Sequence, residues 1–181
     1  MIEEFISSLR AIDILLVMAT GLALFAFQIK GRRKMLSYKL IADIIYATYL
    51  FLLGGLTGAV AAGIATLGGA AQVATPPHLA KKTMPYRFVF ACILSAIGAY
   101  YLSRTLTDTY PLFAVVISRV VELFESTLII RTGFFVGAVL WLIYNYDNGF
   151  YVAMIGTFLM ILSMIFGFIR NERCSPKDPV P

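Results

Sequence analysis

Charged residues are scarce in this sequence. Asp, Glu, Lys and Arg together make up 14% of its 181 residues, whereas about 25% is usual for a soluble globular domain. Apolar residues make up 60%, and the mean hydropathy is +0.83. So little charge excludes an ordinary water-facing domain. We expect an all-α membrane protein in which residues 1–181 form a single transmembrane domain.

Histidine and cysteine are nearly absent as well. His78 is the only histidine, and Cys92 and Cys174 are the only cysteines. Metal sites and nucleophilic sites that use these residue types need several of them close together. The chain also has no nucleophile elbow and no phosphate-binding loop. We therefore expect a protein that is not an enzyme, with no catalytic residues, no metal and no cofactor.

Basic residues exceed acidic ones by 15 to 10, which gives a net charge of +5. The densest basic stretch is KGRRK, at residues 30–34. In a membrane protein such a stretch usually marks a cytoplasmic loop beside anionic lipid headgroups. No helix-turn-helix pattern or aromatic-rich basic groove accompanies it. We therefore expect the lipid bilayer as a partner and no nucleic acid.

Apolar runs indicate how often the chain crosses the membrane. About 20 apolar residues span the hydrocarbon core, and charged and turn residues separate one run from the next. All spans should be helices, because a lone strand in lipid would leave its backbone polar groups unpaired. Seven transmembrane helices are predicted, at about residues 11–29, 36–53, 58–75, 88–102, 112–130, 133–146 and 150–169.

The positions of Lys and Arg predict the orientation, because positive charge collects in cytoplasmic loops. With seven spans, 12 of the 15 Lys and Arg residues fall on one side, and only Arg10 and Arg104 fall on the other. We expect a multi-pass protein of the bacterial inner (plasma) membrane, with its N-terminus outside and its C-terminus in the cytoplasm. Residues 171–181 are predicted to form a disordered cytoplasmic tail.

A weak internal repeat appears when the chain is aligned with itself. Placing Tyr46 against Trp141 brings Tyr49 opposite Tyr144 and Gly54 opposite Gly149, without a gap. This match predicts two three-helix repeats, at about residues 11–75 and 112–169, joined by a linker helix at about 88–102. An odd number of helices per repeat plus one linker makes the two repeats parallel, related by an axis along the membrane normal.

Three stretches carry a resemblance to a known family. They are GRRKMLSYKLIADIIYATYLFLLGGLTGAV, VLWLIYNYDNG and SMIFGFIR. Together they resemble the YgjV family of small bacterial inner-membrane proteins, and the most specific pieces are LLGGLTGA and LWLIYN. The resemblance implies a distant relationship to SWEET and PnuC-like transporters of the MtN3/PQ-loop superfamily, which have three plus one plus three helices. It implies no named sugar or amino-acid substrate, because no Pro-Gln pair marks the helices of this sequence.

The repeat directs attention to four aromatic residues and one amide. Tyr46 and Tyr49 are paired with Trp141 and Tyr144, and Asn145 adds an uncharged donor and acceptor beside them. In a two-repeat transporter, equivalent positions face each other across the central cavity, so we expect these residues to contact substrate. Trp141 and Tyr144 are also compatible with an interfacial aromatic belt, which would be a purely structural role.

A charged stripe lies in the fifth predicted span. Arg119, Glu122 and Glu125 fall within an arc of about 120° on a helix. A lone charge at the centre of a membrane costs at least about 2.5–3.5 kcal/mol, so Glu122 is the expected local partner of Arg119. One interpretation places Arg119 and Glu122 in the substrate site. The other makes them a neutralised pair that only locks neighbouring helices together.

The sequence therefore predicts transport of a small polar solute, whose identity it leaves open, by a site at the midplane between the repeats. The alternative is a non-transporting membrane interaction or scaffold protein, because a parallel repeat does not determine function. A homo-oligomer is also left open. A polar cavity between the repeats distinguishes the two functions, since a scaffold can pack that space shut.

Overall fold

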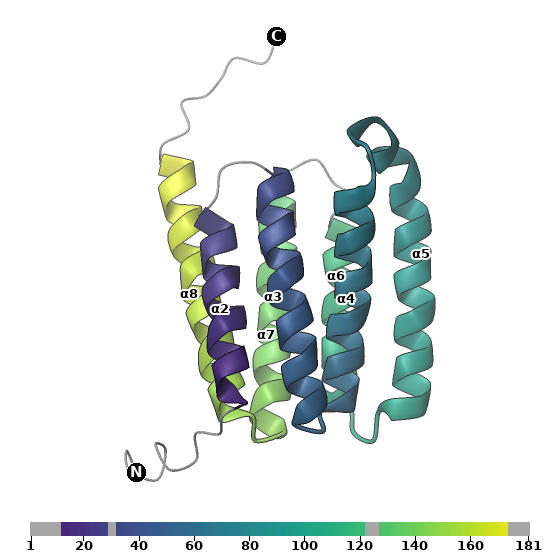
Figure 1. The fold of residues 1–181 in the computed structure, drawn as a ribbon, viewed down its shortest axis with the longest axis vertical. Coiled ribbons are helices and arrows are strands. Elements are labelled where there is room, and N and C mark those ends of the chain that lie inside the picture. Colours follow the sequence, from purple (N-terminus) through teal and green to yellow (C-terminus); the bar gives the residue numbers. More distant parts are fainter. Residues whose placement is uncertain (1–11, 29–31, 122–126, 174–181) are drawn as a thin grey trace.

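The computed structural model describes residues 12–28, 32–121 and 127–173, and the regular structure in these ranges is helical, without strands. The prediction of an all-α protein is therefore confirmed for the part of the chain that is described. The helices stand side by side in a single bundle (Figure 1). They are α2 (Asp13–Gln28), α3 (Arg32–Leu52), α4 (Leu56–Ala74), α5 (Pro77–Leu102), the short 3-10 helix η1 (Thr107–Thr109), α6 (Tyr110–Val121), α7 (Thr127–Asp147) and α8 (Tyr151–Arg173).

The two halves of the chain have the same pattern of contacts between helices. In the first half of the chain, α2 packs on α3 and α3 on α4; in the second half, α6 packs on α7 and α7 on α8. The halves meet where α2 contacts α8 and where α4 contacts α6, so the first helix of each half touches the third helix of the other. Helix α5 packs on α4 and α6 at one edge of the bundle (Figure 1).

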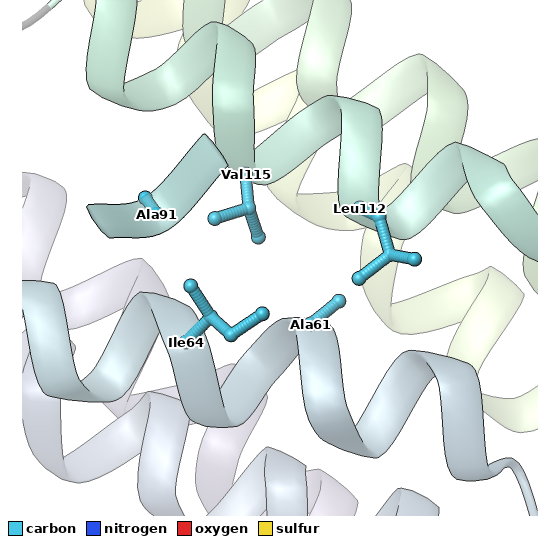
Figure 2. Packing of buried hydrophobic residues seen from close by; sticks show 5 residues of the cluster. All are labelled: Ala61, Ile64, Ala91, Leu112 and Val115. Carbon is cyan, nitrogen blue, oxygen red and sulfur yellow. The ribbon is translucent and has the colours of Figure 1, made fainter. Parts of the chain in front are cut away.

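Each of these two junctions has its own buried cluster. At the junction of α4 and α6, Ala61 and Ile64 pack with Leu112 and Val115, and Ala91 of α5 completes the group (Figure 2). At the junction of α2 and α8, Leu16 and Ala153 pack with Tyr49 and Leu50 of α3. Alanine in both clusters lets neighbouring helices approach closely, as is common between helices in membranes.

The same turn closes α3 and α7. Gly54 and Gly149, which are 95 positions apart, both have positive φ, at 80° and 69°. The backbone N–H of Gly55 donates to the carbonyl of Leu50 at 2.9 Å, and that of Phe150 donates to the carbonyl of Asn145 at 2.8 Å. This is the Schellman pattern, in which a left-handed glycine ends a helix. The recurrence agrees with the pairing of Gly54 with Gly149 in the sequence.

Alanine at either turn is expected to lower stability. Nothing lies within 4 Å of a Cβ built on Gly54 or Gly149, so the cost comes from the left-handed backbone alone. That cost is about 1–2 kcal/mol for an L-residue. Gly21, inside α2, also has open space around its Cβ position, so Gly21→Ala is a matched control that should stabilise by up to about 1 kcal/mol. Thermal unfolding in detergent checks this; equal melting temperatures for all three variants would contradict it.

Length and composition alone support fewer membrane spans than predicted. Among the described residues, two helices are long and apolar enough to cross a membrane, Leu56–Ala74 and Lys82–Leu102. Asp13–Ala26 and Tyr151–Phe166 are apolar but shorter. Helix α3 begins with three basic residues, and the described part of α6 has only 12 residues. Seven spans, the parallel repeat and the orientation therefore stay predictions.

The helices extend beyond several of the predicted spans. Helix α5 begins at Pro77, before the predicted span at residue 88, because hydropathy detects the apolar part of a helix and misses a start that carries Lys81, Lys82 and Arg87. The fifth span was predicted to run to residue 130, yet Thr127 already begins α7, so Arg131 lies within a helix and not between two. Helix α8 continues to Arg173, which places residues 171–173 in a helix instead of the predicted tail. Residues 174–181 lie outside the described part of the chain.

Candidate functional site

A cavity of about 140 Å³ lies at the centre of the bundle. Helices α2, α3, α4, α6, α7 and α8 all contribute to its lining, whereas α5 contributes none of it. The six lining helices are those assigned to the two predicted repeats, and α5 is the predicted linker. The cavity is smaller than the roughly 300–1,000 Å³ of sites for drug-sized ligands, so it suits a solute of few atoms.

The lining residues occur in pairs. Nine pairs are separated by the same 95 positions that relate Gly54 to Gly149. Both halves of the chain therefore present the same positions to the cavity. The pairs are Ala19 and Ala114, Thr20 and Val115, Ala23 and Ser118, Lys39 and Phe134, Ala42 and Gly137, Asp43 and Ala138, Tyr46 and Trp141, Ala62 and Thr157, and Ala65 and Met160.

One part of the lining is polar but uncharged. The amide Nδ2 of Asn145 donates to the Tyr46 hydroxyl at 3.1 Å and to Oγ1 of Thr157 at 3.2 Å. The Tyr46 hydroxyl also lies 3.4 Å from Oδ1 of Asn145, and Thr157 donates to the carbonyl of Ala153 at 2.9 Å. Tyr46 and Thr157 line the cavity, while Asn145 is fully buried behind them. We call Tyr46, Asn145 and Thr157 the neutral wall.

The predicted aromatic residues divide into two groups. Tyr46 and Trp141 line the cavity, with ring centroids 5.4 Å apart in an edge-on arrangement. Tyr49 and Tyr144 are buried and do not belong to its lining. They were expected to face each other across the cavity, and in this respect the prediction differs from the geometry. The reason is their position along the helix axis. Tyr49 lies three residues after Tyr46 on α3, and Tyr144 lies three residues after Trp141 on α7, so both are nearer the end of the helix than the cavity is.

The two buried tyrosines hold helix ends together instead. The Tyr49 hydroxyl donates to Oδ1 of Asp13, the first residue of α2, at 3.1 Å. The Tyr144 hydroxyl accepts from the backbone N–H of Gly58 at 3.2 Å, so α7 is tied to the other half of the chain. A Cβ on Gly58 would lie 2.8 Å from this hydroxyl, which explains why glycine occupies the position.

The charged lining residues belong to α3 and α6. Lys39 and Asp43 form the ion pair that their spacing of four predicts, at 2.6 Å, and both contribute to the cavity. Arg119 is only 6% exposed, and its Nη2 donates to the carbonyl of Ala65 at 3.4 Å. Its guanidinium lies against Gly68, where a Cβ would approach Cζ to 3.0 Å. Glu122 and Glu125 lie outside the described residues, so the pairing of Arg119 with Glu122 stays a prediction.

The described residues contain no group of three or more His, Cys, Asp or Glu side chains arranged to hold a metal ion. What the lining offers a ligand is therefore a set of hydroxyls, one ion pair and one guanidinium around apolar walls. Such a lining can bind and orient a small solute through hydrogen bonds and charge.

Comparison with protein families identifies the chain. A family model described as Imp-YgjV, bacterial inner membrane protein, matches residues 10–174. The chain belongs to the Imp-YgjV family. It is therefore a bacterial inner membrane protein, and the resemblance drawn from LLGGLTGA and LWLIYN is confirmed. No curated protein and no solved structure matches the chain.

Membership of Imp-YgjV explains the outer surface of α5. Tyr86, Phe90 and Tyr100 are exposed by 74%, 55% and 81% of their area. On a soluble monomer so much exposed apolar area would indicate an interaction site. On an inner-membrane protein it suits contact with lipid, with the tyrosines matching the aromatic preference of membrane interfaces.

Sequence reasoning on this Imp-YgjV chain missed several lining residues. Thr157 was not considered, although the repeat pairs it with Ala62 of the Gly- and Ala-rich helix α4. Lys39 and Asp43 were not predicted as lining residues either. Comparing every residue of a helix, and not only the aromatic ones, with the residue 95 positions away would have identified these lining residues.

Proposed function

We propose that this Imp-YgjV protein moves a small polar solute across the bacterial inner membrane through its central cavity. The proposal includes two parallel three-helix repeats joined by α5, as in SWEET-like and PnuC-like architecture. The observation that carries it is the lining, in which nine pairs of residues share one offset of 95 positions. A site built equally from two repeats, at their interface, is the arrangement expected of repeat transporters.

The presence of the cavity also favours transport over a scaffold role. Small side chains in the lining keep a space of about 140 Å³ open between the helices. A protein that served only as an interaction platform would gain stability from larger side chains at Ala42, Ala62 or Ala65, all of which line the cavity. Retaining small residues there is what a solute site requires.

The two junctions between the halves provide the surfaces on which the repeats would move. Gly156 of α8 faces Thr20 of α2, because a Cβ at that glycine would lie 2.8 Å from Oγ1 of Thr20. At the other junction, a Cβ on Gly98 of α5 would lie 3.4 Å from Cδ2 of Leu112, and Ala91 of α5 belongs to the buried cluster there. Small residues at these junctions let the neighbouring helices approach closely. No catalytic step is part of this proposal.

Uptake by liposomes tests the proposal directly. Purified protein is reconstituted and screened with pools of small radiolabelled polar solutes, with protein-free liposomes as the blank. Tyr46→Phe removes one lining hydroxyl and should lower uptake by about tenfold, the cost of one hydrogen bond lost to a buried polar group. Tyr100→Phe removes a hydroxyl from an 81% exposed residue and is the matched control. No uptake of any pool above the blank would support the scaffold alternative.

Cysteine labelling tests the proposed topology along one helix. In a background with Cys92 and Cys174 replaced by serine, Lys82→Cys and Arg104→Cys place thiols at exposed positions near opposite ends of α5. A membrane-impermeant maleimide added to spheroplasts should label the second variant and spare the first. Lysed spheroplasts should give labelling of both. Labelling of Lys82→Cys in intact spheroplasts would contradict the orientation with the N-terminus outside.

A further inference from the structure

The three side chains of the neutral wall are hydrogen-bonded to one another through Asn145. Asn145 has no exposed surface, and both of its amide hydrogens are directed to hydroxyls, one on α3 and one on α8. Burying an amide without partners costs about 1–3 kcal/mol in proteins, so its bonds hold it in place. Asn145 therefore fixes the positions of two hydroxyls that come from different halves of the chain.

The first half of the chain shows that the fold does not need these polar groups. The residue 95 positions before Asn145 is Leu50, which is equally buried. The residue 95 positions before Thr157 is Ala62, which is 3% exposed and also lines the cavity. Equivalent positions in the same kind of turn and helix are thus packed with apolar side chains. The polar set in the second half has a purpose other than packing.

The remaining hydrogen-bonding capacity of the wall is specific. Thr157 uses its hydrogen on the carbonyl of Ala153 and accepts one bond from Asn145, so one lone pair of its oxygen stays available. The Tyr46 hydroxyl accepts from Asn145, and within the described part of the chain its own hydrogen has only the 3.4 Å contact with Oδ1, which is long for an O–H donor. A ligand can recruit that hydrogen at little cost. The wall therefore offers one donor and one acceptor.

We propose that the neutral wall is the subsite for an uncharged solute group that both accepts and donates a hydrogen bond, namely a carboxamide or a hydroxyl. The group accepts from Tyr46 and donates to Thr157, while Asn145 acts as a positioning residue. This subsite rests on the proposed function, because it names the class of solute that the same cavity takes.

A carboxylate fits this wall poorly. It has no hydrogen to give to Thr157, and it would have to leave water for three uncharged side chains. The described lining holds two cations, and neither belongs to the wall. Lys39 lies seven residues or about 10 Å of helix from Tyr46 and is bonded to Asp43 at 2.6 Å, and Arg119 of α6 donates to the carbonyl of Ala65 at 3.4 Å. An amide and a carboxylate of the same shape therefore differ in affinity because of the wall.

Trp141 supplies the readout, because it is the only tryptophan in the chain and lies 5.4 Å from the Tyr46 ring. Its fluorescence is titrated in detergent-solubilised full-length protein with propionamide, 1,2-propanediol and propionate. The amide and the diol are expected to give saturable changes, with propionate binding at least about tenfold more weakly. Asn145→Leu, which installs the residue of the first half, should lower propionamide affinity by about tenfold and leave propionate unchanged.

Threonine variants separate recognition from packing. Thr157→Ser keeps the hydroxyl and should retain affinity for propionamide, whereas Thr157→Val keeps the shape and should lose about tenfold. Thr66→Val is the matched control, because Thr66 makes the same bond to a carbonyl four residues earlier, in α4, and does not line the cavity. A loss with Thr66→Val as large as that with Thr157→Val would overturn the proposal.

Three further results would also overturn it: no saturable change with any probe, propionate binding as tightly as propionamide, or an equal loss of both probes in Asn145→Leu. The subsite and the transport proposal fail separately. Saturable, amide-selective binding without uptake in liposomes refutes transport and leaves the subsite standing. Uptake of solutes without any selectivity for an uncharged group refutes the subsite and leaves transport standing.

Discussion

Ala65→Phe is expected to abolish solute uptake by liposomes that contain the protein. Ala65 of α4 lines the cavity, and its counterpart across the repeat is Met160 of α8. A phenyl ring at this position occupies much of a space of about 140 Å³. A solute cannot enter a site that a side chain already fills, so the loss should be close to complete and not a change of affinity alone.

Ala71→Phe is the matched control for this variant. Ala71 lies on the same helix, six residues further on, and is exposed at the outer surface. A larger apolar side chain there contacts lipid, so uptake should stay within about twofold of the parent protein. Both variants are checked for a single peak in size-exclusion chromatography. Full uptake by a monodisperse Ala65→Phe protein would show that the solute does not pass through this cavity.

Arg119→Met is expected to reduce uptake by at least about tenfold in protein that remains monodisperse. Arg119 is 6% exposed and contributes a guanidinium to the cavity lining. Removing one member of a buried polar contact can itself destabilise a protein, so uptake is compared between monodisperse preparations. Intramembrane charges also mark solute pathways in many membrane proteins. Arg119→Lys retains the charge and should keep more of the activity.

The glycines next to Arg119 provide an independent test of its position. A Cβ on Gly68 would lie 3.0 Å from Cζ and Nη1 of Arg119, whereas a Cβ on Gly69 would meet only Leu40 Cδ1 at an ordinary 3.6 Å. Gly68→Ala should therefore displace the guanidinium and reduce uptake. Gly69→Ala should leave uptake unchanged and stabilise α4 by up to about 1 kcal/mol.

A different pattern would reduce Arg119 to a packing role. If Arg119→Met lowers the melting temperature by several degrees while the folded fraction keeps full uptake, its charge serves only to hold α6 against α4. That result would favour the interpretation of the charged stripe as a lock between helices. Equal uptake by the Gly68→Ala and Gly69→Ala variants would also support a packing role for Arg119.

Local patterns predicted the helices well and their ends poorly. The apolar runs at 58–75 and 150–169 correspond to α4 and α8, because hydropathy and helical structure coincide in the apolar part of a span. Helix α5 begins eleven residues before its predicted start, since a helix can carry charged residues beyond the apolar run. The pairing of Gly54 with Gly149 was also visible in the sequence, because a left-handed turn restricts which residue can occupy it.

The sequence by itself determined that the protein is apolar, helical and a member of the Imp-YgjV family, because composition and motifs are properties of the chain alone. The sequence also contained the offset of 95 positions that relates the two halves of the chain. Only the tertiary structure decided which paired residues reach the cavity. Tyr46 and Tyr49 lie on similar faces of one helix, yet Tyr46 lines the cavity and Tyr49 donates to Asp13. Depth along the bundle separates them, and depth depends on how six helices pack against each other, which no local pattern records.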